Sequence, residues 1–145
     1  MLMGEGWKDS IYKAAQKHGA DPERAWVWET FSQVYLDASH SDQELQDMAI
    51  ELAGSRFSTA ELAHIAFYEV NPICIWNVFY WEWGGFDTDW LFPRCLKQQR
   101  KNPYKASSTP DDIPLFLTIL AGIWLDASRL VDRARRIRMT RKAAQ

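Results

Sequence analysis

Residues 69–90 read EVNPICIWNVFYWEWGGFDTDW, and this stretch decides the fold expected of the chain. It holds four of the eight tryptophans, and its centre, Pro72–Trp83, has apolar residues on every side of a helix. A helix that is apolar all round is normally buried by the elements that pack on it. Asn71 is expected to cap this helix before Pro72, and Gly84-Gly85 to end it. We therefore expect the other helices to surround Pro72–Trp83.

Clear helix-start signals precede this stretch. Asp21-Pro22-Glu23 supplies an N-cap carboxylate, a proline at the first helical position and an acid near the positive helix end. Ser41 and Glu44 have the spacing of a capping box, and Ser58 and Glu61 repeat it. The expected helices here span residues 7–18, 22–38 and 42–53, and a fourth begins at residue 59 and carries Glu69 on its apolar stripe.

The chain beyond residue 90 is also expected to be helical. Asp87 is expected to cap a short piece that reaches Leu91, and Pro93 to limit or kink any helix that continues past it. Residues 98–111 are polar and rich in turn formers, which indicates a loop, and a long helix then runs from residue 112 to about 139. No segment has a convincing strand alternation. The prediction is an all-α, single-domain bundle (1–145) of about six helices around the central apolar helix, with a long C-terminal helix.

Composition favours an ordered globule, with 47% hydrophobic and 25% charged residues. The net charge of −2 hides an asymmetry: residues 1–128 carry 10 basic and 18 acidic residues, whereas 129–145 carry seven basic residues and one acid. No signal peptide is visible, and the longest apolar run, 113–125, has 13 residues against the roughly 20 that a membrane span needs. Cys74 and Cys95 form no disulfide framework or zinc set. We expect a cytoplasmic, reduced protein that is not inserted in a membrane.

Several polar and turn residues around the central helix are given structural roles. Glu69 lies on an apolar stripe, and a bond to the start of the next helix is favoured over a role as catalytic acid. Glu82 and Asp87 bracket a glycine turn, where bonds to backbone amides are favoured over a sugar or acid–base site. The residues predicted to be structural are Glu69, Asn77, Glu82, Gly85, Asp87 and Trp90.

No catalytic, cofactor or metal motif is complete, so neither a cofactor nor a metal is expected. Glu61-x-x-His64 has half the pattern of a carboxylate-bridged di-iron site, but a full site repeats this spacing on a second helix and adds two glutamates. Hydrolase and phosphate-loop motifs are missing from the sequence. Non-enzymatic function is the prediction.

Several short pieces between Val27 and Leu91 match one family. They are VW at 27–28, LD at 36–37, S-x-x-S-x-x-EL at 55–62, EV-x-P at 69–72, Asn77, and EW-x-GFD-x-x-WL at 82–91. On these pieces the chain resembles a family of small bacterial helical proteins of unknown function. The first helix and the long C-terminal helix lie outside the matching block. The resemblance implies a small helical domain and assigns no activity, so it carries no catalytic role to any residue.

The leading functional hypothesis is a bacterial protein-binding module, in its narrower form an immunity or antitoxin-type protein that neutralises a cognate toxin by direct binding. An acidic body associates quickly with a basic partner. Trp26 falls on the polar side of its helix, where cover by another helix end is favoured over an exposed anchor. The candidate contact residues, expected on solvent-facing surfaces, are Trp26, Glu29, Asp37, Asp42 and Asp47.

Two alternatives remain open. One is a small enzyme with a carboxylate site, formed by Glu69, Glu82 or Asp87, beside the central helix. The other is a regulator whose arginine-rich end, 129–145, binds nucleic acid. The acidic body disfavours a duplex, so a solvated helix end is preferred, or a clamp onto the acidic body of the same or another subunit. A homodimer through the C-terminal helix is a further alternative.

Overall fold

The computed structural model describes residues 5–33, 41–74, 87–105 and 121–144, and its elements are helical throughout these ranges. They are α1 (Glu5–Lys17), α2 (Pro22–Ser32), α3 (Asp42–Ala53), α4 (Thr59–His64), the π-helical η2 (Ile65–Val70), α5 (Asn71–Cys74), α6 (Thr88–Lys101) and α8 (Ala121–Ala143). Because α4, η2 and α5 follow one another without a gap, the described residues form six helical segments and no strand. The all-α prediction is confirmed.

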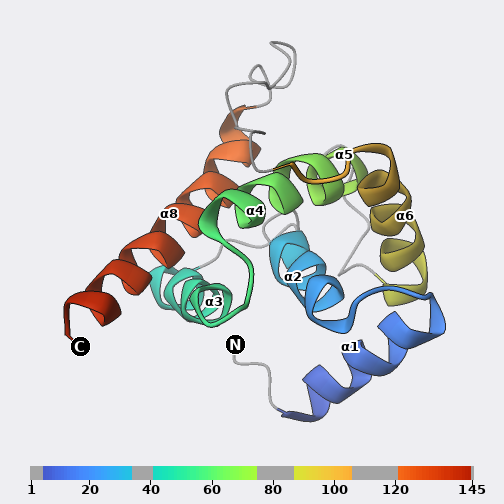
Figure 1. Ribbon diagram of the computed structural model, residues 1–145, viewed down its shortest axis with the longest axis horizontal. Helices are drawn as coiled ribbons and strands as arrows, with labels where there is room; N and C mark the ends of the chain where they lie inside the picture. The colour runs from blue at the N-terminus through green and yellow to red at the C-terminus, as the bar shows by residue number, and fades with distance from the viewer. Residues whose placement is uncertain (1–4, 34–40, 75–86, 106–120, 145) are drawn as a thin grey trace.

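Helix α2 lies in the middle of the arrangement, between α1, α6, the α4–α5 segment and α3 (Figure 1). Nine consecutive residues, Arg24–Ser32, are buried. Thr30 Oγ1 donates to the carbonyl of Trp26 (2.9 Å) and Ser32 Oγ to that of Glu29 (2.6 Å), so both hydroxyls are satisfied within the helix. The expectation of one polar side on this helix is therefore wrong within α2. The predicted central helix, Pro72–Trp83, and its Gly84-Gly85 end lie almost entirely outside the described residues.

The caps predicted from the sequence are present. Ser41 and Glu44 form the capping box of α3, with Glu44 N–H donating to Ser41 Oγ (3.1 Å). Ser58 accepts from Glu61 N–H (3.1 Å) at the start of α4, but the second predicted capping box is only half formed, because the Glu61 side chain accepts from Arg24. Asp87 accepts from Asp89 N–H (3.0 Å), but the helix that it starts is longer than predicted, because α6 continues through Pro93 to Lys101.

The expected break at Asn71-Pro72 is wrong. Asn71 has helical dihedral angles, and its N–H donates to the carbonyl of Ala66, a π-type bond that joins η2 to α5. A proline in a regular α-helix clashes with the carbonyl four residues earlier and removes one hydrogen bond. The wider π turn directly before Pro72 lets the chain continue as a helix instead of restarting.

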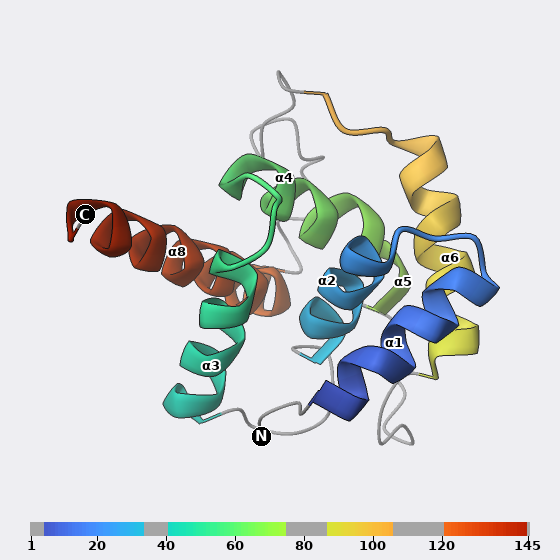
Figure 2. The same ribbon diagram turned by 60° about the horizontal axis from the view of Figure 1, so that its bottom comes forward.

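The helices pack in two groups. Helix α1 contacts α2 and α6, and η2 contacts α2 and α6, which gives one side of the core. On the other side α8 lies across α3 and also contacts α4 (Figure 2). The buried apolar residues form one cluster that takes Ile11 from α1, Trp28 from α2, Leu52 from α3, Phe92 from α6 and Leu130 from α8.

Candidate functional site

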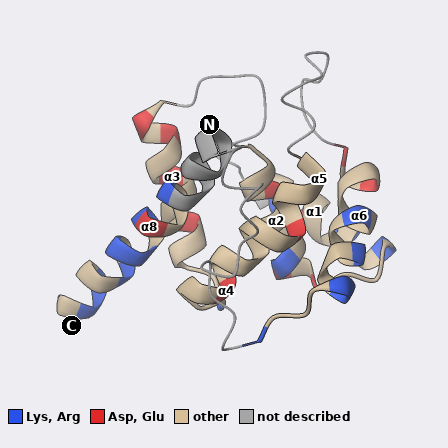
Figure 3. Cartoon of the chain, turned by 90° about the horizontal axis from the view of Figure 1, so that it is seen from above, with Lys and Arg blue, Asp and Glu red and all other residues tan. Residues whose placement is uncertain are grey.

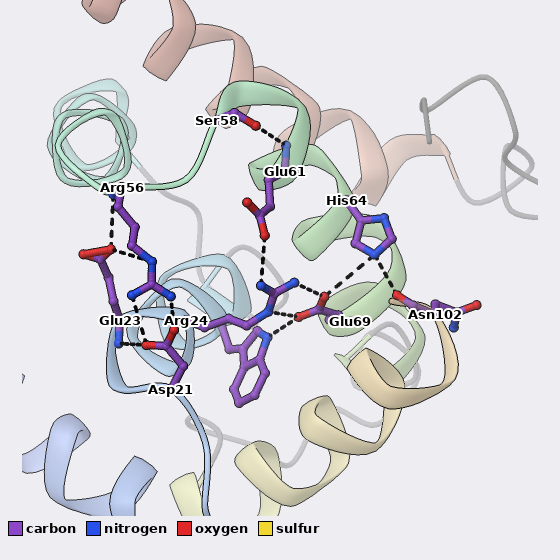
Figure 4. Close-up of polar contacts among 10 residues, drawn as sticks. Asp21, Glu23, Arg24, Arg56, Ser58, Glu61, His64, Glu69 and Asn102 are labelled. Atoms are coloured by element: carbon purple, nitrogen blue, oxygen red, sulfur yellow. Dashed lines mark hydrogen bonds and ion pairs between the residues drawn. The ribbon is translucent and has the colours of Figure 1, made fainter. Parts of the chain in front are cut away.

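A buried arginine and a buried glutamate meet between α2 and η2. Arg24 on α2 and Glu69 on η2 are 6% and 0% exposed. Arg24 Nε donates to Glu69 Oε1 (2.8 Å) and Nη2 donates to Oε2 (2.5 Å), so the ion pair is bidentate (Figure 4). Fork-to-fork pairing of this kind is stronger and more directional than a single contact. The pair ties α2 to η2.

Two more side chains complete this cluster. Trp28 Nε1 donates to Glu69 Oε1 (2.8 Å), and Arg24 Nη1 donates to Glu61 Oε2 (3.1 Å). The guanidinium also lies 5.5 Å from the ring centre of Phe57. Burial opposes the positive charge, but the hydrogen bonds and negative charges of Glu69 and Glu61 outweigh it and raise the pKa of Arg24. We call Arg24, Trp28, Glu61 and Glu69 the Arg24 cluster.

His64 lies at the edge of this cluster, beside two tyrosines. Its Nε2 is 2.8 Å from the carbonyl of Asn102 and 3.8 Å from Glu69 Oε2. A carbonyl only accepts, so Nε2 carries the proton and donates. The ring packs against Tyr68 and Tyr104, at centroid distances of 4.8 and 5.3 Å. The buried Nδ1 has no hydrogen-bond partner within the described residues. His64 thus joins the end of α6 to α4.

The chemistry open to the Arg24 cluster is limited. Three donors, two from Arg24 and one from Trp28, hold the Glu69 carboxylate, which is 0% exposed and so is closed to a substrate that arrives from solvent. Glu69 is held by partners on α2 and not, as predicted, by the start of the following helix, and its structural role stays a prediction. Within the described ranges, no group of three or more His, Cys, Asp or Glu side chains is placed to hold a metal ion.

The other residues predicted to be structural lie in different parts of the chain, and three of them are outside the described residues. Asp87 is exposed and caps α6, away from Glu69. Trp90 is half-buried, and the guanidinium of Arg94 lies 4.7 Å from its ring centre. Asn77, Glu82 and Gly85 lie outside the described residues. Glu69, Glu82 and Asp87 are expected to converge on one pocket if the protein is an enzyme. Glu69 and Asp87, the two that are described, do not converge.

Two of the predicted contact residues are buried. Trp26 is 3% exposed, because α1 packs on α2 and Lys8 Nζ lies 5.1 Å from the Trp26 ring centre. Glu29 is 8% exposed, and burial raises its pKa to about 7. Their expected exposure is wrong, since α2 has no solvent-facing side here. Cover of Trp26 by another helix, the favoured interpretation of its position, is confirmed.

Of the remaining contact residues, Asp42 and Asp47 lie on α3. Asp42 is exposed, with Oδ1 accepting from Arg133 Nη2 (2.6 Å). Asp47 is half-buried and accepts from Gln43 Nε2 (2.9 Å). Asp37 lies outside the described residues. The role of Asp42 and Asp47 in partner binding stays a prediction.

Asp42 also lines a cleft between α3 and α8, with a volume of about 860 Å³. One wall comes from the face of α3 that carries Asp42, Gln46 and Ile50. The other comes from α8. Its full lining is Asp42, Gln46, Ile50, Arg129, Asp132, Arg133, Arg136, Ile137, Thr140 and Arg141. We call this feature the α3–α8 cleft.

Arg138 anchors α8 beside this cleft. Its Nε donates to the carbonyl of Ala53 (2.9 Å), and its Nη2 donates to the carbonyls of Ser55 (3.0 Å) and Phe57 (2.5 Å). These carbonyls include orphan acceptors that the end of α3 leaves without intrahelical partners. With the Asp42–Arg133 pair, Arg138 clamps the basic helix onto α3 of the same chain.

Sequence reasoning missed Arg24 and Arg138, the two cations with the most internal partners described above. A signal for Arg24 exists, because a carboxylate in an apolar stripe requires a cation or several donors. Nothing in the sequence pairs residue 24 with residue 69. Arg138 looks like one more residue of a basic helix end, and only the packing of α8 on α3 distinguishes it.

The fold and site together define an all-helical protein with a buried arginine–glutamate pair and an open, charged cleft between two helices. The chain belongs to the family described as Domain of unknown function (DUF7079), which matches residues 22–124. This match extends beyond the resemblance at residues 27–91 and includes the first turn of α8. Neither the curated proteins nor the solved structures contain a match. None of the described helices has the length and apolarity that crossing a bilayer requires.

Proposed function

We propose that this protein is a non-enzymatic protein-binding module. The observation that carries the proposal is the α3–α8 cleft, which combines the exposed Ile50 with Ile137 and a row of arginines. Apolar side chains flanked by arginine are typical of the surfaces that bind other proteins. In the Arg24 cluster, in contrast, the Glu69 carboxylate is fully buried and held by Arg24 and Trp28.

The narrower form of the proposal is an immunity or antitoxin-type protein that neutralises a cognate toxin by direct binding in the bacterial cytoplasm. It is supported by analogy with other small helical inhibitors, and by the lack of a complete catalytic motif in the sequence. A protein of this kind acts by occupying a surface of its target. A stable specific interface buries about 800 Å² on each partner, an area that a chain of this size can supply.

A second candidate function is nucleic-acid binding by the end of α8. The observation that favours it is that Arg135, Arg141 and Lys142 are exposed. Figure 3 shows lysine and arginine gathered along the C-terminal part of α8. Basic side chains on one helix end supply sequence-independent affinity for phosphates. This candidate predicts that deletion of the exposed end removes a salt-sensitive binding activity.

The test is a pull-down with the tagged full-length protein from its native lysate, with and without nuclease treatment, followed by mass spectrometry. We expect one near-stoichiometric protein that stays bound after nuclease treatment. For the narrower form, expression of that partner alone should arrest growth, and co-expression with this protein should restore it.

Each outcome separates the candidates. A protein partner that is not toxic removes the immunity form and keeps the protein-binding module. Recovery of nucleic acid alone favours the second candidate. Recovery of neither, from lysates in which the tagged protein is abundant and folded, overturns the proposal.

A further inference from the structure

The two walls of the α3–α8 cleft differ in chemistry. On α3, Asp42, Gln46 and Ile50 recur every four residues and therefore lie on one face. On α8, the lining runs from Arg129 to Arg141, a length of about 18 Å along a helix axis. All the basic residues of the lining come from α8, and α3 contributes none.

The charge of the lining is positive in sum. Four arginines, at 129, 133, 136 and 141, face two aspartates, at 42 and 132. Both aspartates are engaged within the chain: Asp42 by Arg133 at 2.6 Å, and Asp132 by Arg136 at 2.5 Å. Arg136, although paired with Asp132, and Arg141 are both exposed. Because the lining has four arginines and two aspartates, an occupant meets a net positive charge.

The cleft also has an apolar component. Ile50 on α3 is 41% exposed, and Ile137 lies on the opposite wall. An occupant that covers both isoleucines removes apolar surface from water, which is favourable. Affinity for this surface therefore depends on apolar contact as well as on charge.

The lining favours a protein segment over nucleic acid. Single strands are held by aromatic platforms on which bases stack, together with a continuous basic groove. The lining contains no aromatic residue among its described members, and it places two carboxylates beside the arginines. Isoleucines next to arginines suit a peptide that carries both apolar and acidic side chains.

We propose that the α3–α8 cleft binds an acidic amphipathic helix of the partner protein, with its carboxylates toward α8 and its apolar side chains on Ile50 and Ile137. This inference rests on the proposed protein-binding function and names the chemistry of the partner segment. A helix with apolar residues at i, i+3, i+4 and i+7 presents both faces at the required spacing. Three turns of helix match the length of the arginine row.

The experiment uses the full-length protein and a labelled peptide of about 16 residues, which is roughly 24 Å as a helix. The peptide carries glutamate on one face and leucine on the other, and a matched peptide carries glutamine in place of glutamate. Fluorescence anisotropy at low salt should give a dissociation constant of about 1–100 µM for the acidic peptide. The glutamine peptide should bind about tenfold more weakly or not at all.

Variants locate the binding. Arg141→Glu and Ile50→Gln should each weaken the acidic peptide by about fivefold or more. Arg100→Glu is the matched control, because Arg100 is exposed at the end of α6, on the opposite side of the molecule from α8 (Figure 1). It should leave the affinity unchanged. Circular dichroism confirms that each variant keeps its helices.

The proposal is overturned if the two peptides bind equally, if neither binds, or if Arg141→Glu and Ile50→Gln behave like Arg100→Glu. It is also overturned if single-stranded DNA of the same charge competes better than the acidic peptide. A pull-down with the Ile50→Gln, Arg141→Glu double variant distinguishes this failure from that of the proposed function. Equal capture of the partner by wild type and variant removes only the cleft, whereas no capture by wild type removes the protein-binding function itself.

Discussion

Arg24 and Glu69, 45 residues apart in the sequence, form a bidentate ion pair that is closed to solvent between α2 and η2. Desolvation of two charges is costly, and the Coulomb attraction recovers that cost only when the geometry is good and the remaining hydrogen-bond sites are filled. Here Trp28 adds a hydrogen bond to Glu69, and Glu61 accepts one from Arg24. The pair fixes which residues of the two helices face each other.

Replacing one partner of this pair should be severe. Arg24→Met leaves the Glu69 carboxylate buried without its cation, and we expect a loss of about 3–5 kcal/mol in the free energy of unfolding. Urea titration followed by tryptophan fluorescence measures it. The double variant Arg24→Met, Glu69→Leu should recover part of the loss, because it leaves no fully buried charge: Glu61 loses its cation but is partly exposed, and only the indole N–H of Trp28 loses its buried acceptor. A single variant within about 1 kcal/mol of wild type would contradict this explanation.

Glu29 makes stability depend on pH near neutrality. Its pKa rises from 4.5 to about 7 on folding because burial disfavours the carboxylate. The folded state then holds the proton more tightly than the unfolded chain, so stability is highest below about pH 4.5 for this group and falls as the pH rises towards about 7. The loss is on the order of 3 kcal/mol.

The Glu29→Gln variant tests this dependence. Unfolding in urea at a series of pH values between about 5 and 8 should show a flatter profile for the variant than for wild type. At the upper end of that range the variant should be the more stable protein. Asp47→Asn, at a half-buried carboxylate on α3, is the control and should keep the wild-type profile. Parallel profiles for Glu29→Gln and wild type would refute the assignment.

Arg138 should stabilise the fold far more than its neighbour Arg135. Arg138→Ala removes donors from the carbonyls of Ala53, Ser55 and Phe57 and leaves acceptors at the end of α3 unpaired, at a cost of about 1–3 kcal/mol. Arg135→Ala removes only an exposed pair with Asp132 and should cost less than about 0.5 kcal/mol. Thermal unfolding followed by circular dichroism compares the two. Equal losses would show that the contacts of Arg138 with α3 add nothing.

Gly19 and Gly54 form a matched pair for a backbone test. Gly19 has a φ of 71°, where a side chain is strained, although an added Cβ would meet nothing within 4 Å. Gly19→Ala should cost about 1–2 kcal/mol. Gly54 has a φ of −79°, and its nearest contact to an added Cβ is 3.6 Å, so Gly54→Ala should be neutral or stabilising by up to about 1 kcal/mol. Denaturant titration gives both differences, and the reverse order would contradict the cause given.

Local signals predicted local structure well. The caps at Ser41, Ser58 and Asp87 are present because each depends on residues within three positions along the chain. The partners of Glu69 were not predictable, because they lie on a helix far away in the sequence. The burial of α2 was missed for a related reason: Thr30 and Ser32 satisfy their own hydroxyls on the helix backbone, so a polar pattern did not mean an exposed face.

The π-helical turn before Pro72 has a consequence for how the two ends of the α4–α5 segment are oriented. A π turn contains about one residue more than an α turn, so it acts as a one-residue insertion in an otherwise regular helix. Everything after it is rotated by roughly 100° about the axis relative to an uninterrupted α-helix. The face that α5 presents to α6 is therefore not the continuation of the apolar stripe of α4, as it would be in an uninterrupted α-helix. A single-residue deletion within 65–70 would bring the two ends into one register and turn a different side of Asn71–Cys74 toward the core.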